Sequence, residues 1–140
     1  MKDASRAIVK AVRAALIADT NIGPAVGTRI AANWGATLVP PYIRIRVPQT
    51  ERFEIDDRSG SRDGAETRVS LHAFVKDGDA VSVHEIAAWM RDAFQDRDGL
   101  VVDGAETVMT TYRDTVFRAD PDDPALQMAI VTIVVTTVTT

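Results

Sequence analysis

The alternation of apolar and polar residues is clearest over residues 66–76, where every second position is apolar from residue 69 onward. This period of two predicts a half-buried strand. A glycine between two aspartates then favours a turn, and the apolar spacing changes to a helical one from Val83 to Phe94. The helix N-cap is either Ser82, in a capping-box sequence with Glu85, or Asp79 one turn earlier. Because a tight turn joins them, we expect strand and helix to bury their apolar faces against each other or a common sheet.

A second amphipathic helix is predicted at residues 3–18. Its apolar positions cluster on one arc, and Arg6, Lys10 and Arg13 cluster on the other. We interpret this basic stripe as a solvated helix face, and the alternative is a contact with an acidic partner surface. Residues 25–41 follow as an irregular connector. Its expected apolar anchors into the core are Val26, Ile30, Trp34 and Leu38.

Residues 42–47 alternate regularly and predict a strand. We expect this strand to end at Pro48, because proline cannot donate a hydrogen bond to a sheet. The segment ERFEIDDRSGSRDG at residues 51–64 consists mostly of charged residues and glycine. Such a composition buries too little apolar surface to hold one conformation in the free chain. We therefore expect a long flexible loop that connects this strand to the strand at residues 66–76.

The remainder of the chain predicts three more strands. Residues 100–102 before the Asp103-Gly104 turn predict a short hairpin strand, and residues 105–117 predict a longer strand of irregular alternation. In residues 126–138, β-branched and apolar residues fall on both faces, which predicts a central strand covered on both sides in its middle. The predicted fold is α+β: one domain over residues 1–140, with a mainly antiparallel β-sheet packed against two α-helices. The element order is α-β-β-α-β-β with a short extra hairpin strand.

Composition supports a soluble globular domain and excludes several classes of function. The 140 residues are 46% hydrophobic and 26% charged, and no apolar run reaches the roughly 18 residues of a membrane span. The first residues lack the apolar core of a signal peptide, so we expect a chain that is not exported. The net charge of −4 argues against a high-affinity, sequence-independent nucleic-acid binder. The absence of cysteine excludes disulfides, thiolate nucleophiles and cysteine-ligated zinc sites.

No motif predicts catalysis, a cofactor or a metal. His84-Glu85 begins like the helix motif of zinc proteases, but Ala88 replaces the second histidine that would hold the metal. The other histidine of the chain is His72, and both histidines lie on the polar faces of their predicted elements. The aspartates of the turn-like segments lack the spacing of a calcium-binding loop. We expect a protein that is not an enzyme, and a hydrolase that uses His72 or His84 is the competing hypothesis.

Short segments spread over nearly the whole chain form an ordered set without a catalytic signature. They are Ala18-Asp19, Gly27-Thr28-Arg29-Ile30, Pro41-Tyr42-Ile43, Val69-Ser70-Leu71-His72-Ala73-Phe74, Arg91-Asp92-Ala93-Phe94, Leu100-Val101-Val102-Asp103-Gly104 and Asp120-Pro121-Asp122. In this order they resemble the tail-completion, or tail-terminator, proteins of long-tailed phages and phage-like gene transfer agents.

The resemblance implies a structural virion protein with no reaction and no cofactor. It implies a ring of identical subunits, expected to be a hexamer, that caps the tail tube, ends tail elongation and presents a surface to the head. The implied partners are further copies, the major tail tube protein and a head-completion (stopper or connector) protein. DNA only passes through the channel, and no membrane is involved. The implied location is the head–tail junction of the virion, after synthesis in the bacterial cytoplasm.

Two alternatives to the tail terminator stay open. The first is a head–tail connector or head-completion protein of the same particle. The second is a small non-catalytic α+β binding domain with no role in a virion.

Two sets of residues are candidates for assembly contacts. The charged residues of the 51–64 loop are expected to contact a neighbouring subunit or the tail tube: Arg52, Glu54, Asp56, Asp57, Arg58, Arg62 and Asp63. The second set is a candidate subunit interface, because the strand at residues 105–117 carries little of the charge and proline that usually protect a sheet edge. It consists of Arg6, Lys10, Arg13, Arg113 and Asp114.

Overall fold

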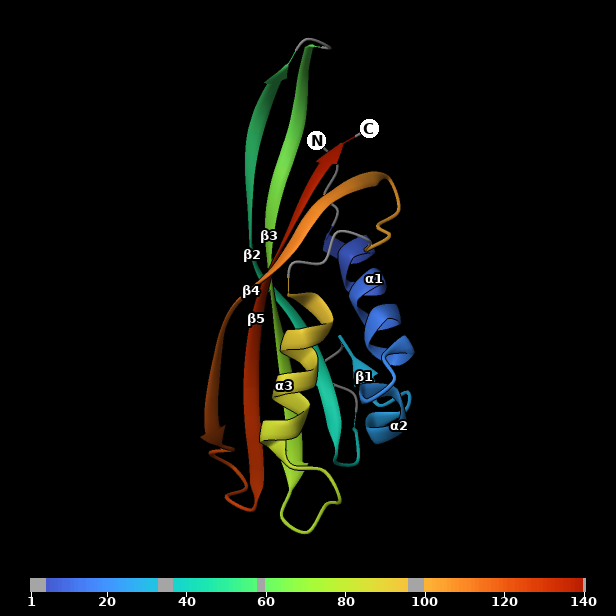
Figure 1. The fold of residues 1–140 in the computed structure, drawn as a ribbon. Coiled ribbons are helices and arrows are strands. Elements are labelled where there is room, and N and C mark those ends of the chain that lie inside the picture. The colour runs from blue at the N-terminus through green and yellow to red at the C-terminus, as the bar shows by residue number, and fades with distance from the viewer. Residues whose placement is uncertain (1–4, 33–36, 58–59, 96–99, 140) are drawn as a thin grey trace.

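The computed structural model describes residues 5–32, 37–57, 60–95 and 100–139 (Figure 1). Within these residues the helices are α1 (Ser5–Ala18), α2 (Ile22–Val26) and α3 (Val83–Phe94). The strands are β1 (Ile30–Ala31), β2 (Tyr42–Asp57), β3 (Gly60–Lys76), β4 (Ala105–Ala119) and β5 (Leu126–Thr139). They form one sheet in the order β1-β2-β3-β5-β4, in which β1 is parallel to β2 and the other pairs are antiparallel. The predicted α+β class with a mainly antiparallel sheet is confirmed.

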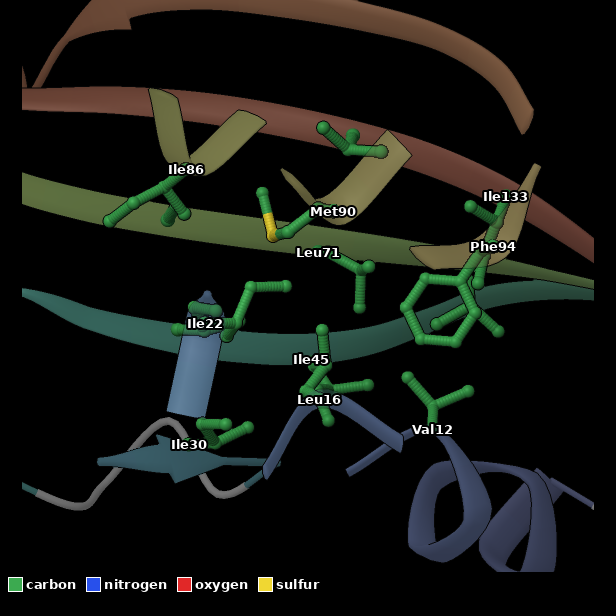
Figure 2. Close-up of a cluster of buried hydrophobic side chains, with 14 of the residues drawn as sticks. Val12, Leu16, Ile22, Ile30, Ile45, Leu71, Ile86, Met90, Phe94 and Ile133 are labelled. Atoms are coloured by element: carbon green, nitrogen blue, oxygen red, sulfur yellow. The ribbon is translucent and has the colours of Figure 1, made fainter. Parts of the chain in front are cut away.

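One face of the sheet packs against α1 and α3, and this layer holds the main core (Figure 2). The spacing of i, i+4 and i+8 on α1 places three apolar side chains on one buried stripe, and α3 contributes a second stripe. Burial of each such Leu, Ile or Phe side chain contributes about 1.5–3 kcal/mol relative to an exposed one, so this layer is the largest source of stability. Fully buried side chains of this layer include Ile8, Val12, Leu16, Leu71, Ile86, Met90, Phe94 and Ile133.

The start of α3 resolves the choice between two N-caps. The Ser82 hydroxyl accepts a hydrogen bond from the Glu85 backbone N–H at 3.1 Å, and the Glu85 carboxylate accepts one from the Ser82 backbone N–H at 3.2 Å. This is the predicted capping box. Asp79 instead closes the preceding turn, where its Oδ2 accepts a hydrogen bond from the Lys76 backbone N–H.

The connector after α1 is more regular than expected. Asp19 accepts hydrogen bonds from the backbone N–H groups of Asn21 and Ile22, which starts the short helix α2, and β1 then pairs with β2. The anchors Val26 and Ile30 are buried as predicted, and Leu38 packs on a second cluster described below. The expected anchor Trp34 and the expected helix start at residue 3 lie outside the described residues.

The structure corrects the prediction for residues 48–64, because β2 does not end at Pro48. The register of β2 with β3 shifts between Arg46 and Gln49, and β1 covers only residues 43–44 of β2. Proline is tolerated at such an irregularity on an open strand edge. The segment expected to be a flexible loop is instead paired strand up to Asp57 and from Gly60 onward. Residues 58 and 59 lie outside the described residues.

The second half of the chain needs two further corrections. Residues 100–102 form no strand: Leu100 and Val102 are buried in a coil before the turn at Gly104. The expectation that β5 is covered on both sides in its middle is also wrong. β5 is central, between β3 and β4, but Ile130 and Thr132 on its second face are only half-buried. β-branched residues favour strands whether or not both faces are covered.

The irregular alternation predicted for β4 is confirmed and has a structural cause. The register between β4 and β5 shifts once between Thr107 and Met109 and again between Tyr112 and Asp114. Each shift places an extra residue in β4, which interrupts the period of two.

Candidate assembly surfaces

The end of the β2–β3 hairpin projects from the sheet (Figure 1). Pairing of β3 with β5 ends at Gly64 and Val138, whereas pairing of β3 with β2 continues to Gly60 and Asp57. Residues 54–57 and 60–63, which we call the arm, therefore form a two-stranded ribbon beyond the part of the sheet that includes β5 and β4. A two-stranded ribbon is marginally stable alone in water, so the arm is suited to contact another molecule.

The arm includes most of the residues expected to contact a neighbour or the tail tube. The backbones of Glu54, Asp56, Asp57, Arg62 and Asp63 belong to it, and Arg52 lies at its base, opposite Ala65. Arg58 lies outside the described residues. The contacts of this set stay a prediction, but the structure places its members on a strand ribbon and not in a loop.

The three residues of the basic stripe of α1 differ in their contacts. Arg13 donates hydrogen bonds from Nε to the Ile30 carbonyl at 2.8 Å and from Nη2 to the Thr28 carbonyl at 3.4 Å, which fastens α1 to the segment containing β1. Lys10 forms a 3.6 Å ion pair with Asp103, and both side chains are more than three-quarters exposed. Arg6 is exposed. Arg13 therefore has an internal structural role, whereas Arg6 and Lys10 remain on the surface.

The second half of the candidate interface lies elsewhere. Arg113 and Asp114 are exposed at the second register shift of β4, and Asp114 is opposite Thr132 of β5. This position belongs to the sheet face away from the helices, whereas α1 packs on the other face. The structure therefore does not bring the five predicted interface residues together.

The two histidines lie on opposite faces of the sheet. His72 is opposite Ile130 of β5 on the face away from the helices, whereas His84 of α3 contacts the Phe117 ring with centroids 4.3 Å apart. Burial, together with the charges of Arg46 and Arg118, lowers the pKa of His72 to about 4. Among the described residues no group of three His, Cys, Asp or Glu side chains is placed to hold a metal ion. A site built from both histidines is therefore not formed.

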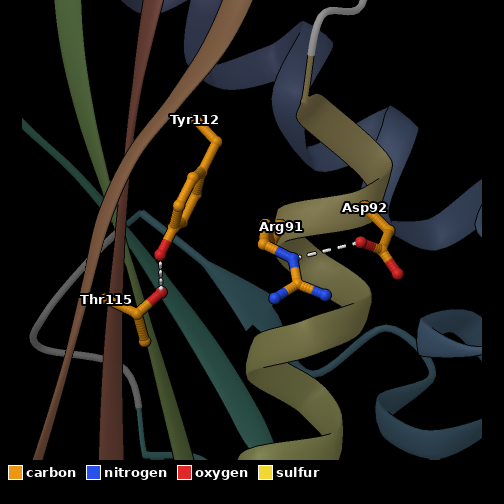
Figure 3. A network of polar contacts seen from close by, with 4 residues as sticks. All are labelled: Arg91, Asp92, Tyr112 and Thr115. Carbon is orange, nitrogen blue, oxygen red and sulfur yellow. Dashed lines mark hydrogen bonds and ion pairs between the residues drawn. The ribbon is translucent and has the colours of Figure 1, made fainter.

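A shallow hollow separates α3 from the edge strand β4 (Figure 3). It has a volume of about 210 Å³ and is lined by His84, Ala87, Ala88 and Arg91 of α3, with Tyr112, Thr115 and Phe117 on the opposite side. The Tyr112 hydroxyl and Thr115 Oγ1 share a hydrogen bond of 2.7 Å, and Arg91 Nε lies 3.1 Å from Asp92 Oδ1. Both pairs of polar side chains are thus formed by near neighbours along the chain.

Comparison with known proteins connects these surfaces to a family. The family model described as tail completion protein gp17 matches residues 7–140, which is nearly the whole chain. The chain belongs to the tail completion protein gp17 family. A structural role in tail completion follows for this chain, and the resemblance stated from the sequence motifs is confirmed.

Solved structures add that the fold of this family member occurs in an assembled particle. A chain in the structure of the virion of a native gene transfer agent particle superimposes with a TM-score of 0.74. The match covers 99% of each chain at 17% sequence identity, so it is a likeness of fold. No curated protein is significantly similar in sequence to this chain. No helix in the described part of this family member could span a membrane.

One surface of this tail-completion chain was not singled out from the sequence. The sheet face away from the helices carries a second apolar cluster of Tyr42, Phe74, Leu126 and Met128. The Tyr42 and Phe74 rings stack with centroids 4.8 Å apart, and the Arg44 guanidinium lies 5.2 Å from the centre of the Tyr42 ring. The alternation of Tyr42, Arg44 and Arg46 opposite the buried side of β2 is the signal that could have found it.

Proposed function

We propose that the chain is a tail terminator: a virion protein that forms a ring of six identical subunits at the head-proximal end of a tail tube. The ring ends elongation of the tube and provides the surface to which the head is joined. DNA passes through its channel without specific binding. The observation that carries this proposal is the match of the tail-completion family over residues 7–140.

The arm supports an assembled state. No other strand of the described residues pairs with its two strands, and ordering them in isolation gains little apolar burial to offset the lost chain entropy. Contact with a neighbouring subunit or with the tube supplies that burial. Arg52, Glu54, Asp56, Asp57, Arg58, Arg62 and Asp63 are the residues that we propose for this contact.

The edges of the sheet support a repeating contact. β4 is an edge strand of 15 residues, and β2 has an open edge beyond its two residues paired with β1. Open edges in a stable protein are normally covered, and a head-to-tail contact that repeats until it closes covers an edge on every copy. Arg113 and Asp114 on β4, together with Arg6 and Lys10 on α1, are proposed members of the joints between subunits.

The experiment that tests this function uses a producing strain that lacks the gene. Without a terminator the tube end stays open, so electron microscopy should show tails of variable, excessive length that carry no head. The intact gene supplied in trans should restore uniform, headed tails. Tails of normal length without heads would instead identify a head–tail connector, and normal headed particles would exclude any role in tail completion.

A further inference from the structure

The sheet face away from the helices is basic, although the whole chain has a net charge of −4. The register across the sheet places five arginines on it: Arg44, Arg46, Arg68, Arg113 and Arg118. We call this surface the arginine face. Its described carboxylates are fewer: Glu51, Glu66, Glu106 and Asp114.

The pairing pattern fixes these positions. Arg44 is opposite His72 and Arg46 is opposite Ser70, and both β3 residues lie on the face away from the main core. Arg118 is opposite Met128 of the second apolar cluster. Arg113 and Arg68 line the same small hollow together with Gln49, Glu51, Glu66 and Val134. The arginines thus come from β2, β3 and the edge strand β4, with β5 between β3 and β4, and they share one face of the sheet.

Apolar side chains lie between these arginines. Val116 is opposite Ile130 and is 44% exposed, while Phe74 and Met128 lie just beneath the surface. A protein interface commonly has such an apolar centre with arginines around it. A phosphate backbone has no apolar counterpart for this centre, so the face is better suited to a protein than to DNA.

The complementary surface lies on the same chain, at the end of the sheet opposite the arm (Figure 1). The turn after β3 and the loop between β4 and β5 lie side by side, because the Asp77 backbone N–H donates a hydrogen bond to the Ala125 carbonyl. We call this region the acidic end. Its carboxylates are those of Asp77, Asp79, Asp120, Asp122 and Asp123, with Lys76 beside them.

The acidic end is pre-ordered. Asp120 Oδ1 accepts a hydrogen bond from the Asp122 backbone N–H at 2.9 Å, and Asp123 Oδ1 accepts one from the Ala125 backbone N–H at 3.2 Å. Asp77, Asp122 and Asp123 are exposed. A rigid, exposed anionic surface loses little conformational entropy when it binds a cationic partner.

We infer that the acidic end of one subunit docks on the arginine face of the next copy of this chain. Contact between the acidic end of one copy and the arginine face of another is heterologous. It therefore repeats around a ring, and every copy uses both surfaces. The inference rests on the proposed ring and adds the two surfaces that join its subunits. Charge complementarity between different parts of one chain also sets the direction of the ring, because two arginine faces repel each other.

Charge reversal tests this contact in producing cells. One variant carries Arg46→Glu with Arg118→Glu, a second carries Asp122→Lys with Asp123→Lys, and a third carries all four changes. Each of the first two should lower the number of headed particles by about tenfold or more, because like charges then meet at every joint. The third restores opposite charges at each joint, so its yield should return to within about threefold of the original.

A matched control reverses charges on the helix side, with Arg91→Glu and Asp92→Lys. This variant should assemble normally, and thermal unfolding should show that every variant is folded. Normal assembly of either the arginine or the aspartate variant, or no gain in the combined variant, would overturn the inference. Loss in the arginine variant alone would assign that face to DNA or another protein, and this too overturns the inference. A hexameric ring seen on unaltered tails would still support the proposed function in each case, whereas the absence of any ring would refute that function itself.

Discussion

Gly64 of β3 pairs with Val138 of β5. Beyond this pair, β3 continues to pair with β2 but no longer with β5. Gly64 is also paired with Phe53 of β2, so this is the last level at which β3 has a strand on both sides. Everything past it is the arm. The arm is thus separable from the core of the sheet, which makes it accessible to a deletion test.

Replacement of residues 54–63 by Asn-Gly should remove tail completion and keep the fold. Asn-Gly forms the two-residue turn that suits a hairpin, and it would join Phe53 to its partner Gly64. We expect the free energy of unfolding to change by about 1 kcal/mol or less, since no residue of the main core is removed. Urea unfolding measures the change in stability, and electron microscopy of tails shows whether tail completion is lost. Uniform, headed tails made with the shortened chain would show that the arm is dispensable.

Arg13→Ala should destabilise the fold more than Lys10→Ala. The first change removes two hydrogen bonds from a charged donor to the Thr28 and Ile30 carbonyls, at a cost of about 1–2 kcal/mol. The second removes an exposed ion pair, which contributes about 0–1 kcal/mol. Urea denaturation of both purified variants compares the two. Equal losses would mean that Arg13 does not fasten α1 to the β1 segment.

His72 should make the fold sensitive to mild acid. Its folded-state pKa is about 4, below the ordinary value of 6.5, so the unfolded chain binds the proton more tightly. Stability contributed by neutral His72 is therefore fully present above pH 6.5 and decreases as the pH falls toward 4. Because the side chain is partly exposed, we expect a loss of about 1–2 kcal/mol over this window. Unfolding free energies of the protein and of His72→Gln should diverge by this amount, and parallel curves would contradict the prediction.

Ser82→Ala should cost about 1 kcal/mol of stability, because the Glu85 backbone N–H loses its capping partner. Ser82→Asp is the matched control, since an aspartate also accepts this hydrogen bond and interacts favourably with the helix N-terminus. The midpoint of thermal unfolding should fall for the alanine variant and stay nearly unchanged for the aspartate variant. An equal fall in both would indicate that the hydroxyl has another role.

Local patterns were sufficient for the elements that form the main core. The period of two at residues 66–76 and the capping box at Ser82 correctly predicted β3 and the start of α3, because both depend on residues close in sequence. Whether the strand continues through Pro48 depends on the register shift beside it and on the open edge of β2. Both are properties of the assembled sheet. A weak signal was nevertheless present: Phe53 and Ile55 alternate with charged residues within the segment interpreted as a loop.

The assembly surfaces were harder to predict than the fold. Arg44 and Arg46 lie on one strand face by simple alternation. Their grouping with Arg68 depends on the register of β2 with β3, and their grouping with Arg118 depends on β5 lying between β3 and β4. That strand order joins segments more than 40 residues apart, and periodicity carries no information about it. Likewise, the internal role of Arg13 could not be separated from the surface roles of Arg6 and Lys10 until the carbonyls of β1 were placed.

The strand order also governs the sequence of events during synthesis. β5 is synthesised after the other strands of this sheet, yet it lies inside the sheet and is the neighbour through which β4 is attached. A nascent chain that ends before Leu126 can close the β2–β3 hairpin, but it leaves β4 without its partner and the edge of β3 uncovered. Both are long strands with unpaired backbone groups, which makes the unfinished chain a target for mispairing with other nascent copies. Premature contact between subunits is thus a hazard of translation for this topology.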